Sequence, residues 1–226
     1  MHMVLIMGHH TVFNDRYVGI VNNMNQYTFH ILGCGAIGSS AAQQLIRMGG
    51  INFILYDKDK VEDVNIGVSQ FDTRHIGIMK SVALMNMMME INRNAIIECK
   101  PYTFVKLYPY GNDIVILGFD SMKSRIEAVE LVLKERNNSI LCLIDGRMGA
   151  ETYQQYNFPN PTVDRYTKTW YPDDQGSEEP CNAKATSYCS NMSGSFIVNA
   201  IRKFITKQPL EKEILFHFPT MMLDTK

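Results

Sequence analysis

Three glycines at a fixed spacing are the first residues of this chain from which chemistry can be inferred. Gly33, Gly35 and Gly38 form the pattern Gly-x-Gly-x-x-Gly directly after an apolar run at residues 29–32. The first glycine permits a tight turn, the second lets a phosphate approach the backbone, and the third allows close packing of a helix. Free N–H groups at the start of that helix attract an anion. The pattern therefore predicts a site for the phosphates of a nucleotide.

An acidic residue follows where a sugar would lie. Asp57 ends a second apolar run, residues 51–56, and its carboxylate can accept hydrogen bonds from ribose hydroxyls. The glycine pattern alone is a weak signal, because it also occurs in turns that bind no ligand. Strand, glycine turn, helix, strand and acid in this order are typical of a Rossmann-type nucleotide site. The residues themselves leave the nucleotide open.

The elements that position these residues can be read from the hydrophobic pattern. We expect an α/β fold of the Rossmann-like type, a mostly parallel sheet with helices on both faces. Expected helices cover residues 39–48, 79–91, 121–134 and 193–206, and expected strands cover residues 29–32, 51–56, 95–100, 113–118, 140–149 and 213–221. Ligands of such sheets gather at the carboxyl ends of the strands. Asp57, Asp120 and Asp145 are the acids expected at three of these ends, and the alternative role of Asp145 is to pair with Arg147.

Residues 157–187 break this pattern. They are rich in Pro, Asp, Thr, Tyr and Glu and lack periodicity, so we expect a long mobile loop before the last helix and strand. Cys181 lies in it, shortly before the expected helix. A cysteine near a helix N-terminus has a lowered pKa and can act as a nucleophile. Its alternative role is to pack the loop against that helix.

Composition places limits on the function. The 226 residues are 46% hydrophobic and 20% charged, with a net charge of −1, so we expect a single domain over residues 1–226 and no nucleic-acid or membrane partner. The odd count of five cysteines suggests reduced thiols and a cytoplasmic location. The apolar stretch at the first residues is too short for the hydrophobic region of a signal sequence.

The stretch after Asp57 adds further motifs, and the ordered set resembles the ThiF/MoeB-type adenylyltransferases, bacterial relatives of ubiquitin-activating enzymes. The resemblance covers about residues 29–205. Its motifs are Gly33-x-Gly35-x-x-Gly38-Ser39, Asp57-x-Asp59-x-Val61, Asn65, Gln70-Phe71, Ile76-Gly77-x-x-Lys80, Ile91-Asn92, Asp120-Ser-x-x-x-Arg125 and Ile144-Asp145-Gly146 with Gly149.

This resemblance implies ATP with Mg²⁺, and transfer of AMP to a carboxylate with release of pyrophosphate. The expected carboxylate is the C-terminus of a small ubiquitin-like or sulfur-carrier protein, or of a peptide. By position, Asp57 would hold the ribose with Asp59 nearby, Lys80 would contact the phosphates, and Asp120 would coordinate magnesium. Asn65 and Gln70 are further candidates for the nucleotide site. The resemblance also implies a homodimer, in which Arg16 of one protomer would reach the ATP of its partner.

The chain departs from the family pattern in two places. The family reads Asn-Leu-x-Arg-Gln, whereas Asn65-Ile-Gly-Val-Ser69-Gln70 has an extra residue and no arginine. Arg74 occupies the place of a second arginine that some members carry, and can serve instead. The two Cys-x-x-Cys pairs that bind structural zinc in several relatives are missing from the sequence, so we expect no zinc. In ubiquitin-activating relatives a loop cysteine forms a thioester, which makes Cys181 the candidate here.

Two other classes remain. An NAD-dependent oxidoreductase is the ordinary expectation for a Rossmann-like fold, but it explains neither Lys80 nor the Asp120–Arg125 turn. A nucleotide-binding scaffold without catalytic activity would explain the missing arginine.

Overall fold

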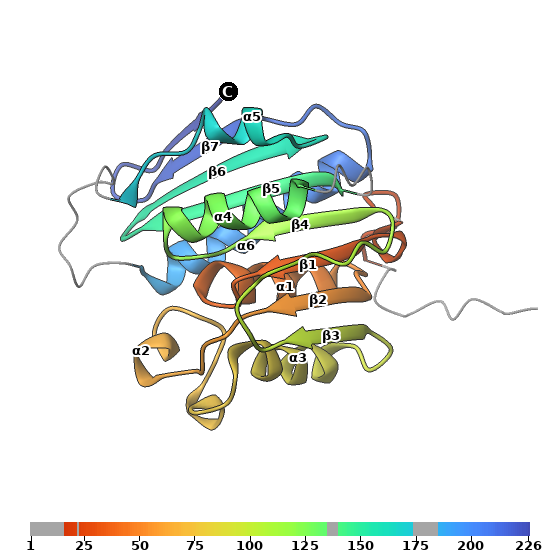
Figure 1. The fold of residues 1–226 in the computed structure, drawn as a ribbon, viewed down its shortest axis with the longest axis vertical. Coiled ribbons are helices and arrows are strands. Elements are labelled where there is room, and N and C mark those ends of the chain that lie inside the picture. Colours follow the sequence, from red (N-terminus) through yellow and green to blue (C-terminus); the bar gives the residue numbers. More distant parts are fainter. Residues whose placement is uncertain (1–15, 22, 135–139, 174–184) are drawn as a thin grey trace, which may run out of the picture.

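One sheet of eight strands, in the order β3-β2-β1-β4-β5-β6-β7-β8, organises the protein. The computed structural model describes residues 16–21, 23–134, 140–173 and 185–226. The strands are β1 Thr28–Leu32, β2 Asn52–Tyr56, β3 Ile96–Lys100, β4 Asp113–Leu117, β5 Ile140–Gly149, β6 Thr152–Pro159, β7 Glu213–His217 and β8 Met222–Thr225. The first five in chain order pair in parallel, whereas β6, β7 and β8 are added antiparallel. Figure 1 shows this succession from β3 to β7.

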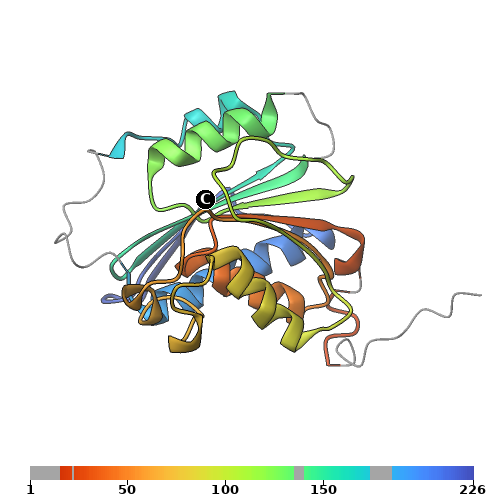
Figure 2. The same cartoon turned by 60° about the horizontal axis from the view of Figure 1, so that its bottom comes forward.

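Helices cover both faces of the sheet. Figure 2 shows α4 and α5 on one face and α1, α3 and α6 on the other. The helices and short 3₁₀ turns are η2 Met24–Gln26, α1 Ala36–Arg47, α2 Asp63–Ile66, η3 Thr73–His75, α3 Lys80–Ile91, α4 Met122–Leu133, α5 Val163–Thr167 and α6 Ser187–Ile205. The expected fold class is therefore confirmed. No helix in the described part of the chain is long and apolar enough to cross a membrane.

The sheet separates two hydrophobic cores, one on each face. Strand β4 contributes to both because alternate side chains point to opposite faces: Ile114 packs with Leu45 and Ile201 on the side of α1 and α6. Val115 packs with Val129 of α4 on the other side. All five residues of β1 and of β4 are buried, as expected for central strands of a parallel sheet.

The described part of residues 157–187 contains regular structure, so the expectation of one continuous loop is corrected, whereas its mobility stays a prediction. Residues 157–159 end β6, and α5 follows with Tyr166 only 1% exposed. The last long helix, α6, begins at Ser187 instead of Ser193. Sequence reasoning also missed that β6 pairs with β5 over eight positions. Residues 174–184, which include Cys181, lie outside the described residues.

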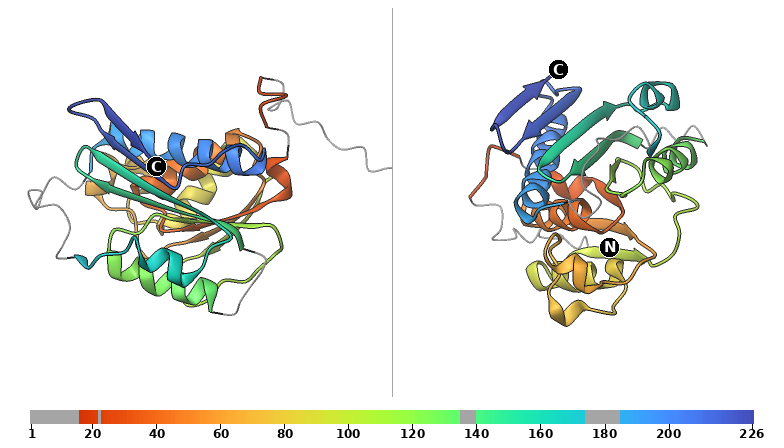
Figure 3. Two further views of the ribbon diagram at one scale, coloured as in Figure 1. Left: turned by 90° about the horizontal axis from the view of Figure 1, so that it is seen from above. Right: turned by 90° about the vertical axis from the view of Figure 1, so that its left-hand side faces the viewer.

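The antiparallel end of the sheet forms a projecting edge. Strands β7 and β8 form a hairpin, seen beyond the helices in Figure 3. Its last strand is exposed at every position. The parallel half of the sheet, not this edge, carries the glycine turn that leads into the site.

Candidate functional site

The glycine turn has the geometry that its sequence predicts. Gly33 has a φ of +92°, and a Cβ added there would lie 2.8 Å from the backbone of Gly118. A Cβ at Gly38 would lie 1.9 Å from the carbonyl oxygen of Gly33. At Gly35, by contrast, an added Cβ meets no heavy atom within 4 Å. Gly33 and Gly38 are therefore needed for the turn and for packing, whereas Gly35 leaves space for a ligand.

Helix α1 begins at this turn with an open N-terminus. Gly35 is its N-cap and supplies no side chain, and the first turn contains no acidic residue. The first N–H groups of a helix have no partner within the helix and form the positive end of its dipole. This end therefore suits an anion such as phosphate.

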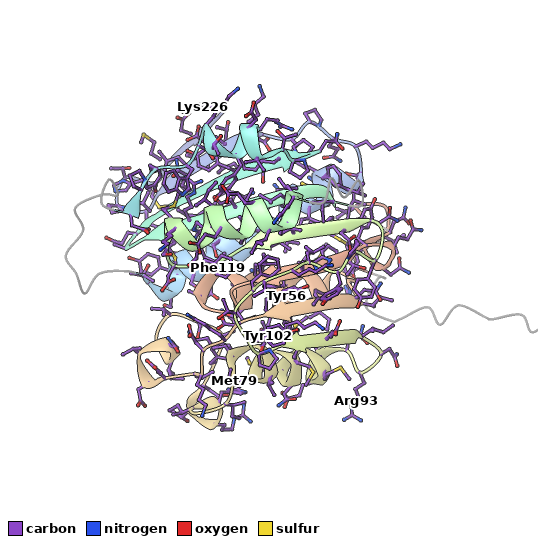
Figure 4. All side chains as sticks on the ribbon, viewed as in Figure 1. Tyr56, Met79, Arg93, Tyr102, Phe119 and Lys226 are labelled. Atoms are coloured by element: carbon purple, nitrogen blue, oxygen red, sulfur yellow. The ribbon has the colours of Figure 1, made fainter. Side chains whose placement is uncertain are left out.

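The open N-terminus of α1 faces a cavity of about 1140 Å³ at the carboxyl ends of the parallel strands. Residues that follow β1, β2, β3 and β4 line it, and β5, β6 and β7 line its far side. Figure 4 labels three of its lining residues, Tyr56, Tyr102 and Phe119. The volume lies slightly above the usual range for a ligand site, about 300–1,000 Å³.

Asp57 is fixed next to the glycine turn. One carboxylate oxygen accepts a hydrogen bond from the backbone N–H of Cys34 at 2.7 Å, and the other accepts from Asp59 N–H at 2.9 Å. Burial raises the pKa of the Asp57 carboxyl, although these two hydrogen bonds and the Lys80 charge act in the opposite direction. The side chain lines the cavity. A carboxylate held in this way presents its remaining lone pairs in a fixed direction.

Lys80 is the first residue of α3, and its side chain is 14% exposed. Its ammonium lies 3.5 Å from the Asp59 carboxylate. Asn65 accepts a hydrogen bond from the N–H of Glu62 and thereby caps the short helix α2. All three of the predicted residues Asp59, Asn65 and Lys80 line the cavity.

Asp120, expected at the end of a strand, also lines the cavity. The residue is exposed and follows the end of β4 by three positions. Among the described residues it has no hydrogen-bond or ion-pair partner. Ser121 caps α4 as expected, accepting from Ser124 N–H at 3.0 Å. A free, solvated carboxylate at the cavity fits a divalent cation better than a structural role.

Asp145 is not at a strand end, because β5 continues to Gly149. Its carboxylate is 0% exposed and forms ion pairs with Arg125 and with Arg147, the latter at 2.7 Å. Burial raises the pKa of the Tyr166 phenol, which donates to the same carboxylate at 3.0 Å. With its lone pairs occupied by these donors, Asp145 is a structural centre beneath the cavity. The expectation of Asp145 as a ligand-facing acid is corrected accordingly.

Three predicted residues do not line the main cavity. Arg74 pairs with Asp72 at 2.7 Å, has a side chain that is 76% exposed, and borders a separate hollow near α1 and α3. Gln70 donates to Asn191 at 2.6 Å, which ties its loop to α6. Arg16 is exposed at the start of the described chain. The roles predicted for these three residues stay predictions, as does that of Cys181.

Sequence reasoning missed other lining residues. Tyr102, Thr103 and Phe104 follow β3, and Phe104 contacts the ring of Tyr56 edge-on with centroids 5.0 Å apart. Their position after a parallel strand was the available signal, because such segments emerge at the ligand edge of the sheet. Asp173, far along the chain, also lines the cavity. Its position gave no such signal.

In the described residues no group of three or more His, Cys, Asp or Glu side chains could hold a metal ion. The described cysteines, Cys34, Cys99, Cys142 and Cys189, are free thiols. The expectation of no structural zinc stays a prediction, because Cys181 lies outside this part of the chain.

The parallel sheet, the open glycine turn and the fixed Asp57 define an α/β protein of the Rossmann-like class. Within that class, the chain belongs to the ThiF family, whose model matches residues 16–223.

The ubiquitin-like modifier-activating enzyme 5 of two organisms is similar in sequence to this chain. That of Bombyx mori is 35% identical over 138 residues, which is 60% of this chain and 33% of the relative. That of Dictyostelium discoideum is 32% identical over 131 residues, 57% of this chain and 32% of the relative. The chain thus spans about a third of the length of these relatives.

Solved structures of E. coli MccB share the fold. MccB with ATP has a TM-score of 0.71 and 17% identity, and the match covers 95% of this chain and 67% of MccB. MccB with AMPCPP and MccA has a TM-score of 0.69 and 16% identity, covering 96% of this chain and 72% of MccB.

Proposed function

We propose that this protein is an adenylyltransferase, which uses ATP and Mg²⁺ to transfer AMP to a carboxylate. The observation that carries the proposal is the open N-terminus of α1 in a cavity that also contains Asp57, Lys80 and Asp120. Membership of the ThiF family supports this assignment. Further support comes from the relatives that activate ubiquitin-like modifiers and from MccB, solved with ATP.

We assign each part of the nucleotide to the region of the cavity that suits its chemistry. The triphosphate would lie at Gly35 and the first N–H groups of α1, where an added methyl has open space around it. The ribose would lie against Asp57, whose carboxylate is held by Cys34 and Asp59. The aromatic segment Tyr102–Phe104 borders the same end of the cavity and offers a surface for the base.

Asp120 fits a magnesium site because it is a solvated carboxylate without a described partner. Carboxylate and phosphate oxygens are the ligands that Mg²⁺ prefers. The bound ion would neutralise phosphate charge. Lys80 would add a second positive charge from the first turn of α3. Neutralisation is needed because an attacking carboxylate and a triphosphate repel each other.

In the proposed reaction a carboxylate oxygen forms a bond with the α-phosphorus while the bond to the β,γ-diphosphate breaks. The products are an acyl adenylate and pyrophosphate. Residues of β5, β6 and β7, including Arg147 and Gln154, line the cavity away from Asp57. The acyl substrate would enter at that side. We propose the C-terminus of a small ubiquitin-like or sulfur-carrier protein, or of a peptide, in keeping with the MccA of the MccB structure.

Pyrophosphate exchange into ATP tests the proposal. With a carboxylate partner present, Lys80→Ala and Asp120→Ala should each lower exchange at least ~100-fold, as expected from loss of transition-state electrostatics. The matched controls are Lys212→Ala and Asp164→Ala, both exposed residues that do not line the cavity. Full exchange in the two site variants would refute the assignment. An equal loss in the controls would show that the effect is not specific to the site.

Competing functions have distinct signatures. Titration with ATP and with NAD distinguishes adenylation from oxidoreduction, which the family does not favour. A scaffold would bind ATP without exchange.

We further propose a homodimer, in which Arg16 acts on the partner's site, and a mass measured by light scattering tests it. The free described thiols fit the cytoplasmic location that we propose.

A thioester at Cys181 is a separate proposal. In this step the thiolate attacks the acyl adenylate, a C–S bond forms, and AMP leaves. Cys181→Ala should keep pyrophosphate exchange and lose a thiol-sensitive adduct with the acyl partner. Loss of both the exchange and the adduct through instability, or loss of neither, would indicate a structural cysteine instead.

A further inference from the structure

The N-terminus of α4 also borders the cavity, but it is closed by a carboxylate from a distant part of the chain. Asp173 accepts hydrogen bonds from Met122 N–H at 2.5 Å and from Lys123 N–H at 3.3 Å. Ser121 accepts from the next free donor, the N–H of Ser124. The donors of the first turn are therefore occupied, unlike those of α1.

Asp173 ends a segment, residues 166–173, that is attached at several points to the site. The indole of Trp170 donates to the carbonyl of Met122 at 2.7 Å. Arg147 donates to the carbonyl of Thr169 at 2.8 Å. Tyr166 at its start is bound to the buried Asp145. We call residues 166–173 the clasp, since they hold the first turn of α4 against the strands beneath the cavity.

The clasp matters because Asp120 immediately precedes the N-cap Ser121. The positive end of a helix attracts any carboxylate within reach. If Asp173 were absent, the N–H groups of Met122 and Lys123 would be free to bind the Asp120 carboxylate or a phosphate. With Asp173 in place, Asp120 has no partner among the described residues and lines the cavity.

We propose that Asp173 is a positioning residue that keeps the N-terminus of α4 occupied, so that Asp120 stays available for Mg²⁺ and the triphosphate binds at α1. This inference rests on the proposed function, because it assigns Asp173 a role toward the metal of that reaction. Asp173 itself touches neither substrate nor metal. It acts through α4 and through the direction of the Asp120 side chain.

Trp170 provides a direct readout, because the chain contains one tryptophan. Its indole hydrogen bond to Met122 makes its emission report on the clasp in the protein without nucleotide. Asp173→Ala should shift this emission to longer wavelength and increase quenching by acrylamide. Asp173→Asn keeps one acceptor oxygen and should give a smaller change. The matched control is Asp164→Asn, an exposed acid of α5 that does not line the cavity.

The second readout is the Mg²⁺ concentration for half-maximal pyrophosphate exchange. We expect it to rise ~10-fold in Asp173→Ala, the lower end of the effect of removing a group that orients a metal ligand. The rate at saturating Mg²⁺ should recover to within ~3-fold of the unaltered chain. The half-maximal Mg²⁺ concentration of Asp173→Asn should lie between those of Asp173→Ala and the unaltered chain, and that of Asp164→Asn should match the unaltered chain.

A merely structural role gives a different pattern. In that case Asp173→Ala lowers the melting temperature and the rate at all Mg²⁺ concentrations, but leaves the half-maximal concentration unchanged, and the inference is overturned. If the unaltered chain shows no exchange, the proposed function fails. The clasp is then judged by the Mg²⁺ dependence of ATP binding in the same variants, and an unchanged dependence overturns it.

Discussion

Adding one methyl group at Gly35 or at Gly38 should separate the function of the glycine turn from its folding. The two residues lie three positions apart, and Ala is the new side chain in both variants. At Gly38 the new Cβ would lie 1.9 Å from the backbone oxygen of Gly33 and 3.0 Å from Ile31. A backbone carbonyl cannot rotate away, so α1 has to move from the sheet. At Gly35 no heavy atom lies within 4 Å.

The two substitutions should affect different quantities: mainly the free energy of unfolding for Gly38→Ala, and mainly the ATP affinity for Gly35→Ala. Forced overpacking costs about 1–3 kcal/mol or more, so Gly38→Ala should lose stability of that order in urea unfolding. Gly35 lies at φ −74° and ψ −145°, outside the main regions that Ala occupies, so its substitution should cost about 1 kcal/mol, the lower end of the cost of a sparsely populated backbone conformation. Because the methyl occupies the space of the cavity, ATP affinity should fall at least ~10-fold, equivalent to about 1.4 kcal/mol.

Calorimetric ATP titration of both variants, together with urea unfolding, is the assay. Gly35→Ala should remain folded and bind ATP weakly. The result that would refute the reasoning is a Gly35→Ala protein that binds ATP as tightly as the unaltered chain. That outcome would place the phosphates away from the N-terminus of α1. A Gly38→Ala protein of unchanged stability would refute the packing argument alone.

Two further predictions concern the acids of the sheet. Asp145→Ala leaves Arg125 and Arg147 buried without their shared carboxylate, so the free energy of urea unfolding should fall by about 3–5 kcal/mol. The control Asp224→Ala, at an exposed residue, should change it little. A fall below ~1 kcal/mol for Asp145→Ala would contradict the structural role of Asp145. For Asp57, burial raises the pKa of the folded chain above the ordinary value of 3.8, so the folded chain holds this proton more tightly than the unfolded chain. The stability attributable to the group therefore falls as pH rises from 3.8 through the raised pKa of the folded chain. Asp57→Asn should show a smaller fall in urea-unfolding free energy over the same interval, and an unchanged pH profile would count against the assigned shift.

The first strand, helix and strand could be predicted from sequence because their signals are local. The glycine spacing, the apolar runs and Asp57 all lie within one continuous unit. The structure places Asp57 against the N–H of Cys34 in that same turn. Lys80 could be placed only through the resemblance, since a lysine at the start of a helix is ordinary. Its contact with Asp59 connects two elements that the sequence shows separately.

The errors arose where tertiary pairing overrides the local pattern. Residues 157–187 look polar and aperiodic, yet one aromatic ring, Tyr166, is buried against Asp145 and orders its helix. Asp145 was expected at the carboxyl end of its strand, but β5 continues past it to Gly149 and pairs there with β6. The register places Gly146, Arg147 and Gly149 opposite β6. The acid therefore lies inside the strand and pairs with Arg147 on the same strand and face.

The choice between two helix N-termini shows why a site of this kind cannot be read from local motifs alone. Both α1 and α4 follow central strands and point their first turns at one cavity. Sequence identifies the cap of each, Gly35 and Ser121. A serine cap by itself satisfies one of the first four N–H donors and leaves those of the first two helical residues open. The carboxylate that fills them comes from Asp173, 51 residues beyond Met122. Because that contact is made only in the folded chain, no local motif shows that Asp173 occupies the N-terminus of α4 while Asp120 beside it has no partner among the described residues.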